Sequence, residues 1–200
     1  MPPGDTAAGA SRSHGAASRV DDAGESLARR ARQAAYLLAL QLLGNADQAR
    51  DVAQETMVRF YRHQDRLDPQ RSVKPWILQV VRNQVKDLWR RKRVRQEQPL
   101  EPGIADFSAE LVDPAPGPDQ NALRHEKQRQ VWAALASMSA SSREILVLRD
   151  FHDLTYDQMA AVLKIPVGTV MSRLHRARQS LREILAGRRA ATLDANQEGA

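Results

Sequence analysis

The 200-residue chain contains no cysteine. A disulfide framework, a thiol redox switch and a cysteine-ligated zinc site are therefore all excluded. Long apolar runs are missing too, because no stretch approaches the roughly 18 consecutive apolar residues of a membrane span. The N-terminus also lacks the apolar core of a signal peptide. We therefore expect a cytoplasmic protein with no membrane insertion.

Residue patterns typical of enzymes are absent as well. The sequence has no Gly-rich phosphate loop and no G-x-S-x-G motif. Its five histidines are scattered, with no pair at metal-ligand spacing. Asp51 and Glu55 lie one helical turn apart but have no third acidic ligand nearby. We predict no catalytic residues, no metal and no cofactor, and hence a protein that is not an enzyme.

Positive charge is in excess, and the formal net charge is +6. Such an excess favours a polyanionic partner, although it carries no information on fold.

The most informative stretch is 154–182. Its first part predicts a short helix, where Thr155 and Gln158 form a capping box. The sequence Ile-Pro-Val-Gly at 165–168 then interrupts the helical pattern. From Thr169 onward, apolar residues recur at helical spacing and leave a strongly basic opposite face. A basic helix alone is more often a solvated core helix, but the turn and the preceding helix favour a DNA-binding helix-turn-helix.

The N-terminal part predicts a disordered tail over 1–22, followed by a helical domain over 23–98. Apolar periodicity places helices at 25–43 and 46–63, and Asn45 with Gln48 is expected to form a capping box. The outward side of the second helix carries an acidic patch that is usually ordinary solvated surface. The apolar residues expected to face inward on the first helix are Leu27, Ala31, Ala34, Ala35, Leu38 and Leu42.

A third helix is predicted from Val73, and it ends in the basic run Arg90-Arg91-Lys92-Arg93-Val94-Arg95. Trp89 directly precedes this run. Clustered cations beside an aromatic ring are suited to hold phosphates while the ring stacks on an unpaired base. Trp89 is a better candidate for such a role than Trp76, which is more often a core residue.

Composition changes at Pro99. Residues 99–121 hold five of the ten prolines and five acidic residues, with no Lys or Arg. This predicts a flexible, acidic, Pro-rich linker. A second helical domain is expected over 122–187, with a capping box formed by Ser141 and Glu144, and a disordered tail over 188–200. The predicted fold class is all-α, with two small helical domains whose mutual arrangement the residues do not fix.

Three motifs occur in a fixed order along the chain. They are A-x-D-V-x-Q-E at 49–55, P-W-I-L-x-V-V-R-N-x-V-x-D at 75–87, and L-T-Y-D-Q-M-A-x-x-L-x-I-P-V-G-T-V-M-S-R-L-H-R-A-R at 154–178. Together they resemble bacterial RNA polymerase sigma factors of the extracytoplasmic-function (ECF) group, the smallest of the sigma-70 type. The position before Ile165 is often small in that family, whereas this chain has Lys164.

The resemblance implies an alternative sigma factor that binds core RNA polymerase and directs initiation at promoters with −10 and −35 elements. Its implied partners are the β′ clamp helices and the β flap of the polymerase, promoter DNA and an anti-sigma factor. For contact with the polymerase it implies Asp51, Gln54 and Glu55. For the −10 element it implies Arg82, Asn83, Lys86, Trp89, Arg90 and Arg91, together with a base pocket in the loop 65–74. For the −35 element it implies Arg149, Thr169, Met171, Ser172, Arg173, His175, Arg176 and Arg178.

Two other classes of protein are weighed against this resemblance. A stand-alone helix-turn-helix regulator would bind its operator as a dimer, but it would not account for the motif at 49–55 or for the basic run. A nuclease would need a metal-binding carboxylate set, which the sequence lacks.

Overall fold

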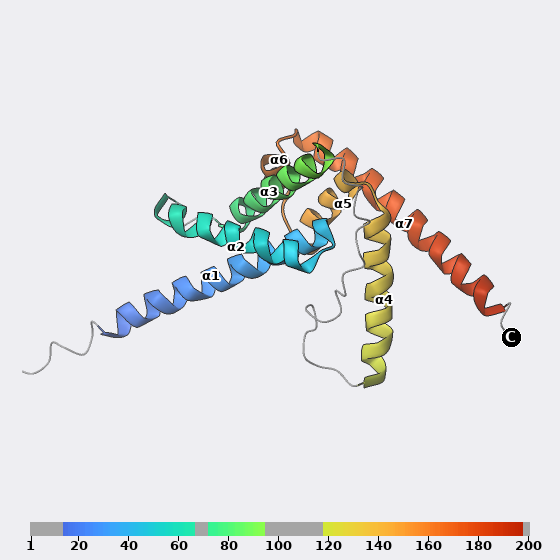
Figure 1. Ribbon diagram of the computed structural model, residues 1–200, viewed down its shortest axis with the longest axis horizontal. Coiled ribbons are helices and arrows are strands. Elements are labelled where there is room, and N and C mark those ends of the chain that lie inside the picture. Colours follow the sequence, from blue (N-terminus) through green and yellow to red (C-terminus); the bar gives the residue numbers. More distant parts are fainter. Residues whose placement is uncertain (1–13, 67–71, 95–117, 198–200) are drawn as a thin grey trace, which may run out of the picture.

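The computed structural model describes residues 14–66, 72–94 and 118–197. Regular structure within these ranges is entirely helical, as the sequence predicts, and the ribbon is drawn in Figure 1. The proline-rich segment that was predicted to be a linker lies mostly outside the described residues.

The N-terminal half is a bundle of α1 (His14–Leu43), α2 (Ala46–His63) and α3 (Lys74–Val94), with a short 3-10 turn, η1 (Gln64–Arg66), after α2. Helix α1 ends at Leu43 and is followed by Gly44, which adopts the left-handed conformation (φ 65°) that glycine tolerates. Asn45 then caps α2, because its side chain accepts a hydrogen bond from the backbone of Gln48 at 2.9 Å. Helix α1 packs against both α2 and α3.

The C-terminal half contains α4 (Pro118–Ser137), α5 (Ala140–Leu146), η2 (Val147–Phe151), α6 (Tyr156–Leu163) and α7 (Val167–Gln197). η2 is a π-helical turn in which His152 N donates to Val147 O at 3.1 Å. Such turns are rare and occur frequently at functional sites. Helix α7 packs against α4, α5 and α6, so it forms the centre of this half.

Three predicted boundaries differ from the structure. Residues 14–22, assigned to the tail, form the first turns of α1, and α7 continues to Gln197, past the predicted end at Gly187. Extending an existing helix avoids the cost of nucleation, so stretches without apolar periodicity can follow it. Pro118 was assigned to the linker but is the first residue of α4, a position where no partner for a backbone N–H is needed.

The predicted helix caps met with different outcomes. The capping box of Thr155 and Gln158 is confirmed in both directions, at 3.3 and 3.0 Å. At Asn45 only the side-chain half of the predicted box forms, because the Gln48 side chain instead accepts a bond from Lys92 at 3.1 Å. The predicted cap at Ser141 is wrong, since Ser139 caps α5 by accepting from Ser142 N.

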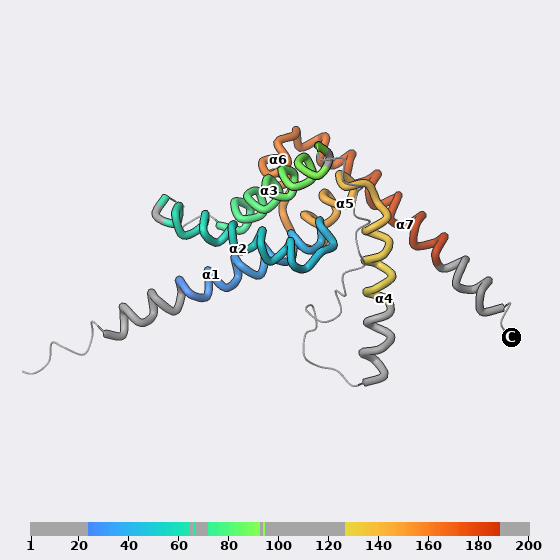
Figure 2. Tube along the Cα trace, viewed as in Figure 1, coloured from blue at the N-terminus to red at the C-terminus, as the bar shows by residue number. Residues whose placement is uncertain are grey.

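A single apolar core connects the two halves. Helix α3 packs against α6, and α1 contacts α5 and η2 (Figure 2). The resulting cluster joins N-terminal residues such as Leu38 and Val81 to C-terminal residues such as Leu148 and Leu174. One predicted core position is wrong, because Leu27 is 40% exposed. None of the described helices is long and apolar enough to cross a lipid bilayer.

Candidate functional site

Asp51, Gln54 and Glu55, which we call the α2 patch, are all exposed on one side of helix α2. Val52 and Thr56 lie on the other side of the helix and are buried in the N-terminal bundle. The alternation follows from helical periodicity, which separates the two faces. The α2 patch therefore offers two carboxylates and an amide to a partner molecule.

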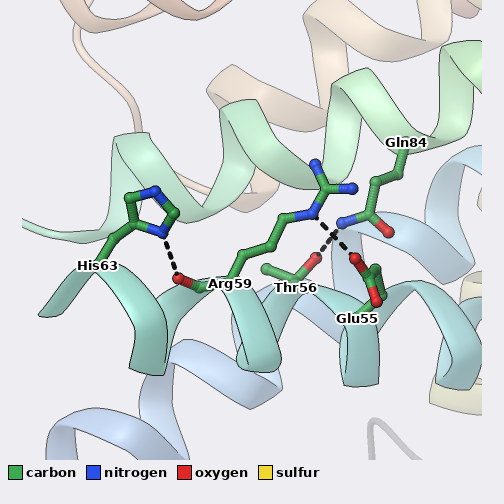
Figure 3. Close-up of polar contacts among 5 residues, drawn as sticks. All are labelled: Glu55, Thr56, Arg59, His63 and Gln84. Carbon is green, nitrogen blue, oxygen red and sulfur yellow. Dashed lines mark hydrogen bonds and ion pairs between the residues drawn. The ribbon is translucent and has the colours of Figure 1, made fainter.

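Glu55 of the α2 patch forms an ion pair with Arg59, one turn further along, at an Oε1–Nε distance of 3.1 Å (Figure 3). The two side chains are 51% and 47% exposed, and exposed pairs of this kind contribute about 0–1 kcal/mol. Exchange of Arg59 for a cation on a partner would therefore cost little. Beneath this pair, Gln84 of α3 donates to the buried hydroxyl of Thr56 at 2.9 Å and fixes α3 against α2.

A groove of about 330 Å³ runs beside the α2 patch, between α2 and α3. Its apolar lining comes from Val52 and Leu88, and Asp51, Asp87 and Arg91 contribute charges. The groove thus combines an apolar floor with mixed charges, as protein-docking surfaces commonly do.

The outward face of α3 carries the residues predicted to contact the −10 element, most of them basic. Asn83, Lys86, Arg90 and Arg91 are exposed, whereas Trp89 is half-buried against the core. Arg90 has an ion pair with Asp87 at 3.1 Å, but the two side chains are 74% and 51% exposed, so the pair is weak. These cations are accessible to phosphate groups.

Arg82 departs from this pattern. The resemblance implies that Arg82 contacts DNA, but Arg82 is only 7% exposed. Its Nε donates to Glu144 Oε1 at 2.7 Å, and its Nη2 lies 3.4 Å from the carbonyl of Leu163. Both partners belong to the C-terminal half. In this arrangement Arg82 is part of the contact between the halves and is not available to DNA.

A pocket of about 220 Å³ surrounds the Arg82–Glu144 pair. Lys86 and Trp89 line it from α3, and Arg173 lines it from α7. Residues predicted to read two different DNA elements therefore lie around one interdomain pocket. The contact of Glu144 with Arg82 was not predicted, because the spacing of Glu144 from Ser141 matched a capping box.

Arg143, the neighbour of Glu144, makes a second polar contact between the halves. Its guanidinium donates to the carbonyls of Leu135 (2.9 Å) and Ala136 (2.7 Å) at the end of α4. It also donates to the carbonyl of Leu42 at the end of α1, at 3.1 Å. These carbonyls belong to the last turns of two helices, where the helix dipole favours a cation. Burial lowers the pKa of Arg143.

His152 makes a third interdomain contact, as its Nε2 lies 2.9 Å from Gln41 Oε1 of α1. The residue is only 4% exposed. Burial, together with the positive charge of Lys74, lowers the pKa of His152 to about 4. The ring is therefore neutral near pH 7, and with Nε2 protonated it donates to Gln41. No sequence pattern indicated either Arg143 or His152.

The helix-turn-helix is present as predicted, although its turn is shorter than expected. Helix α6 ends at Leu163 and is followed by Lys164, which is left-handed (φ 56°, ψ 49°), and α7 already begins at Val167. Pro166 O accepts the first helical bonds of α7, from Thr169 N at 2.9 Å and Val170 N at 3.1 Å. Val170 is fully buried, which fixes the rotation of α7 on the core.

That rotation exposes most of the residues predicted to read the −35 element. Thr169 is half-buried at the start of the helix, where its carbonyl accepts a bond from the Ser172 hydroxyl at 3.2 Å. The exposed members are Met171, Ser172, Arg173, His175 and Arg176. These side chains provide hydroxyl, imidazole, guanidinium and apolar groups of the kinds that contact base edges and phosphates.

The two remaining predicted −35 residues are engaged within the protein. Arg149 donates to Leu154 O at 2.8 Å, and its guanidinium lies 5.2 Å from the ring centroid of Tyr156. Arg178 donates from Nε and Nη2 to the two carboxylate oxygens of Asp150, and this hydrogen bonding raises the pKa of Arg178. Both arginines thus link η2 to the helix-turn-helix.

Metal ligation receives no support from the described ranges, in which no three His, Cys, Asp or Glu side chains converge. The base pocket expected in the loop 65–74 falls largely on residues outside those ranges.

Comparison with known families yields two matches. The N-terminal half matches Sigma-70 region 2 over residues 27–95, and the C-terminal half matches Sigma-70, region 4, over residues 128–181. The two matches coincide with the α1–α3 bundle and with the half that carries the helix-turn-helix.

Individual relatives point the same way. The chain is 33% identical to the ECF RNA polymerase sigma factor SigE of Mycolicibacterium smegmatis, over 81% of this chain and 61% of that protein. It is 33% identical to EcfG of Rhodopseudomonas palustris, over 74% of this chain and 76% of that protein. Among solved structures it resembles the sigma factor RpoE of Bartonella quintana in complex with the anti-sigma factor NepR. That likeness has a TM-score of 0.62 at 26% identity and covers 82% of this chain and 97% of the other.

Proposed function

Because the chain belongs to the ECF group of the sigma-70 family, we propose that it is an alternative sigma factor, which binds core RNA polymerase and directs it to a particular set of promoters. The observation that carries the proposal is the joint exposure of the α2 patch and of the basic face of the recognition helix. One surface is suited to protein and the other to DNA. The polymerase supplies the catalysis, and the sigma factor supplies promoter specificity in the cytoplasm.

In this proposal the α2 patch docks on the β′ clamp helices of the polymerase, with Asp51 and Glu55 as the charged contacts. The adjoining groove would accept apolar side chains of the clamp over Val52 and Leu88. The C-terminal half contacts the β flap. The linker, 99–121 in the sequence-based division, connects the two promoter-binding domains.

The −10 element is bound by α3. Asn83 reads an unstacked base of the displaced strand, and Lys86, Arg90 and Arg91 hold its backbone. Trp89 directly precedes Arg90 on the same helix, so its ring can stack on a base of a strand whose backbone these cations hold. Such stacking contributes about 1–3 kcal/mol per base. Arg82 also contacts the strand in this account, after it has separated from Glu144.

The −35 element is read as duplex by α7, through Met171, Ser172, His175 and Arg176. Thr169, Arg173 and Arg178 contact the neighbouring phosphates. Arg149 acts from η2, where its bonds to Leu154 and Tyr156 hold the start of the helix-turn-helix in place.

An anti-sigma factor is the expected regulator, since the similar RpoE structure from Bartonella quintana contains the anti-sigma factor NepR. The likeness to that structure covers 82% of the present chain.

Docking on the polymerase is tested with Asp51→Arg, measured as binding to purified core RNA polymerase in the absence of DNA. Reversing a charge at a docking surface places like charges together, at a cost of several kcal/mol, so we expect at least a hundredfold loss, or about 2.7 kcal/mol. Glu25→Arg is the matched control, because Glu25 is also exposed in the N-terminal half but lies outside the α2 patch. Equal affinity of the two variants would refute docking through the α2 patch.

A further inference from the structure

We propose that a pocket along helix α1 binds a small amphipathic anion, namely a free long-chain carboxylate of the fatty-acid type. This pocket, which we call the α1 pocket, has a volume of about 630 Å³ and lies between α1, the start of α3 and η2. Its volume falls within the range of about 300–1,000 Å³ that is typical of small-molecule sites. Among the described residues, its lining includes none from the α2 patch or from α7, so the proposal goes beyond the sigma function.

Apolar side chains from three elements form the walls of the α1 pocket. They include Leu27, Ala34 and Leu37 of α1, Val73 and Ile77 near the start of α3, and Phe151 of η2. Leu27 and Phe151 are each 40% exposed. Large apolar side chains that stay exposed around a pocket are typical of a binding site for an apolar group. The ring of Phe151 contacts that of the buried Trp132, at a centroid distance of 4.9 Å, so this wall is already held in place.

The α1 pocket is elongated along the helix. Its α1 lining extends from Leu27 to Gln41, a length of about 21 Å along the helix axis. Ala31 and Ala34, which lie between these ends, have short side chains that leave room beside the helix. A cavity of this form accommodates an extended alkyl chain better than a compact ring system.

Polar groups gather at the Gln41 end of the α1 pocket. Gln41 is only 5% exposed, and its Oε1 lies 2.9 Å from His152 Nε2. Within the described part of the chain, the amide nitrogen of Gln41 has no hydrogen-bond acceptor. A buried donor without a partner is unfavourable, and a carboxylate oxygen of a ligand would satisfy it.

Lys74 supplies the charge that favours an anion at this end. Its residue is half-buried and lines the pocket, and its charge helps to lower the pKa of His152, so Lys74 lies near the Gln41 end. None of the described residues forms an ion pair with Lys74, and no Asp or Glu is among those that line the pocket. A cation in an apolar surrounding is stabilised by a hydrogen-bonded anion, which the head group would provide.

The second cation of the lining, Arg30, lies towards the Leu27 end of the α1 pocket and already donates to Ser26 Oγ at 3.0 Å. We therefore assign the carboxylate to Lys74 and Gln41, and the alkyl chain to the wall that leads past Ala34 to Leu27. Because α1 and η2 belong to different halves of the protein, a bound ligand contacts both. Binding should therefore stabilise the folded chain in proportion to ligand concentration.

Binding is measured by isothermal titration calorimetry of the full chain with dodecanoate, kept below the concentration at which it forms micelles. We expect saturable binding of one molecule per chain and a melting temperature that rises with dodecanoate concentration. Dodecyltrimethylammonium has the same alkyl chain with the opposite charge, and acetate has the same head group without the chain. Both should bind at least about tenfold more weakly than dodecanoate.

Two substitutions test the two ends of the ligand. Lys74→Met keeps an unbranched side chain and removes the charge, so it should weaken dodecanoate binding at least about tenfold. Ala34→Phe fills the middle of the α1 pocket and should abolish binding. Lys127→Met is the matched control, because Lys127 is exposed in the C-terminal half and does not line the pocket, and it should bind as the wild type does.

The position of the ligand is checked by amide NMR of the full chain, in which dodecanoate should shift the resonances of Ala34 and Ile77. Circular dichroism identifies any variant that fails to fold, and the comparison of the three ligands on the wild type decides the question in that case. The proposal is overturned if dodecanoate and dodecyltrimethylammonium bind equally well, or if dodecanoate lowers the melting temperature as a detergent does. Shifts confined to the basic face of α7 around Arg176 would overturn it as well.

Discussion

Acidification should destabilise this protein through His152. The imidazole is 4% exposed, its Nε2 lies 2.9 Å from Gln41 Oε1, and Lys74 adds a positive charge nearby. Protonation would place a second cation beside Lys74 in an apolar interior. For this reason the pKa in the native protein is about 4, against 6.5 for an ordinary histidine.

The direction and size of the effect follow from these two values. Above about pH 6.5 the ring is neutral in both the native and the unfolded protein, and the stabilisation is fully present. Between about pH 6.5 and 4 only the unfolded chain takes up the proton, so the free energy of unfolding falls as the pH falls. The full difference of about 2.5 pKa units corresponds to about 3.4 kcal/mol, of which about 2 kcal/mol is lost by pH 5.

Urea unfolding at about pH 7.5 and about pH 5 measures this loss, with His152→Gln as the reference. Glutamine keeps a donor for Gln41 but does not titrate, so carboxylate contributions cancel when the pH dependences of the two proteins are compared. The wild type should lose about 2 kcal/mol more than the variant over this range. Equal losses, or an NMR titration of His152 near its ordinary pKa, would refute the reasoning.

Three further substitutions test the helix-turn-helix. Thr155→Ala removes the capping box of α6 and should lower the free energy of unfolding by about 1 kcal/mol in urea titrations, whereas a change below a few tenths would contradict the cap. Lys164→Gly relieves a left-handed residue (φ 56°) and should raise thermal stability by about 0.5–1 kcal/mol, while destabilisation would show that the Lys164 side chain stabilises the turn. Arg176→Ala should weaken binding of the polymerase holoenzyme to a −35 duplex by about 1–3 kcal/mol, and unchanged affinity in a gel-shift assay would exclude Arg176 from readout.

Local features of the fold could be predicted from the sequence because local patterns encode them. The capping box at Thr155, the N-terminal cap of α2 at Asn45 and the buried Val170 all follow from spacing within one helix or turn. The presence of helices in both halves of the fold likewise follows from apolar periodicity. Helix ends were less predictable, since an existing helix extends through residues such as those at 14–22 that carry no apolar repeat.

Contacts between the halves could not be predicted in the same way. Arg82 and Glu144 are 62 residues apart, and neither belongs to a periodic pattern that relates one to the other. In sequence, Arg82 is one cation on a basic face and Glu144 is one carboxylate near a helix start. Only the packing of α3 against the C-terminal half, which includes Glu144 of α5, brings them together, and it changes the environment of Arg82 from solvent to protein interior.

In the candidate site, too, the exposure of residues could be predicted from the sequence, whereas their contacts could not. Exposure of the α2 patch and of residues such as Arg176 follows from the opposite, apolar faces of α2 and α7. Engagement of Arg149 and Arg178 within the protein depends on η2, a π-helical turn that no sequence pattern announced. Their partners, Leu154 and Asp150, are set by that turn.

Run-off transcription tests the central claim most directly. Purified core RNA polymerase is incubated with a DNA template carrying the upstream region of this protein's own coding sequence, with and without the protein. The account predicts transcripts from one defined start site only when the protein is present, and their loss with Asp51→Arg. No transcript together with no binding of core polymerase, or tight binding of the template by the protein alone, would contradict it and favour a stand-alone regulator.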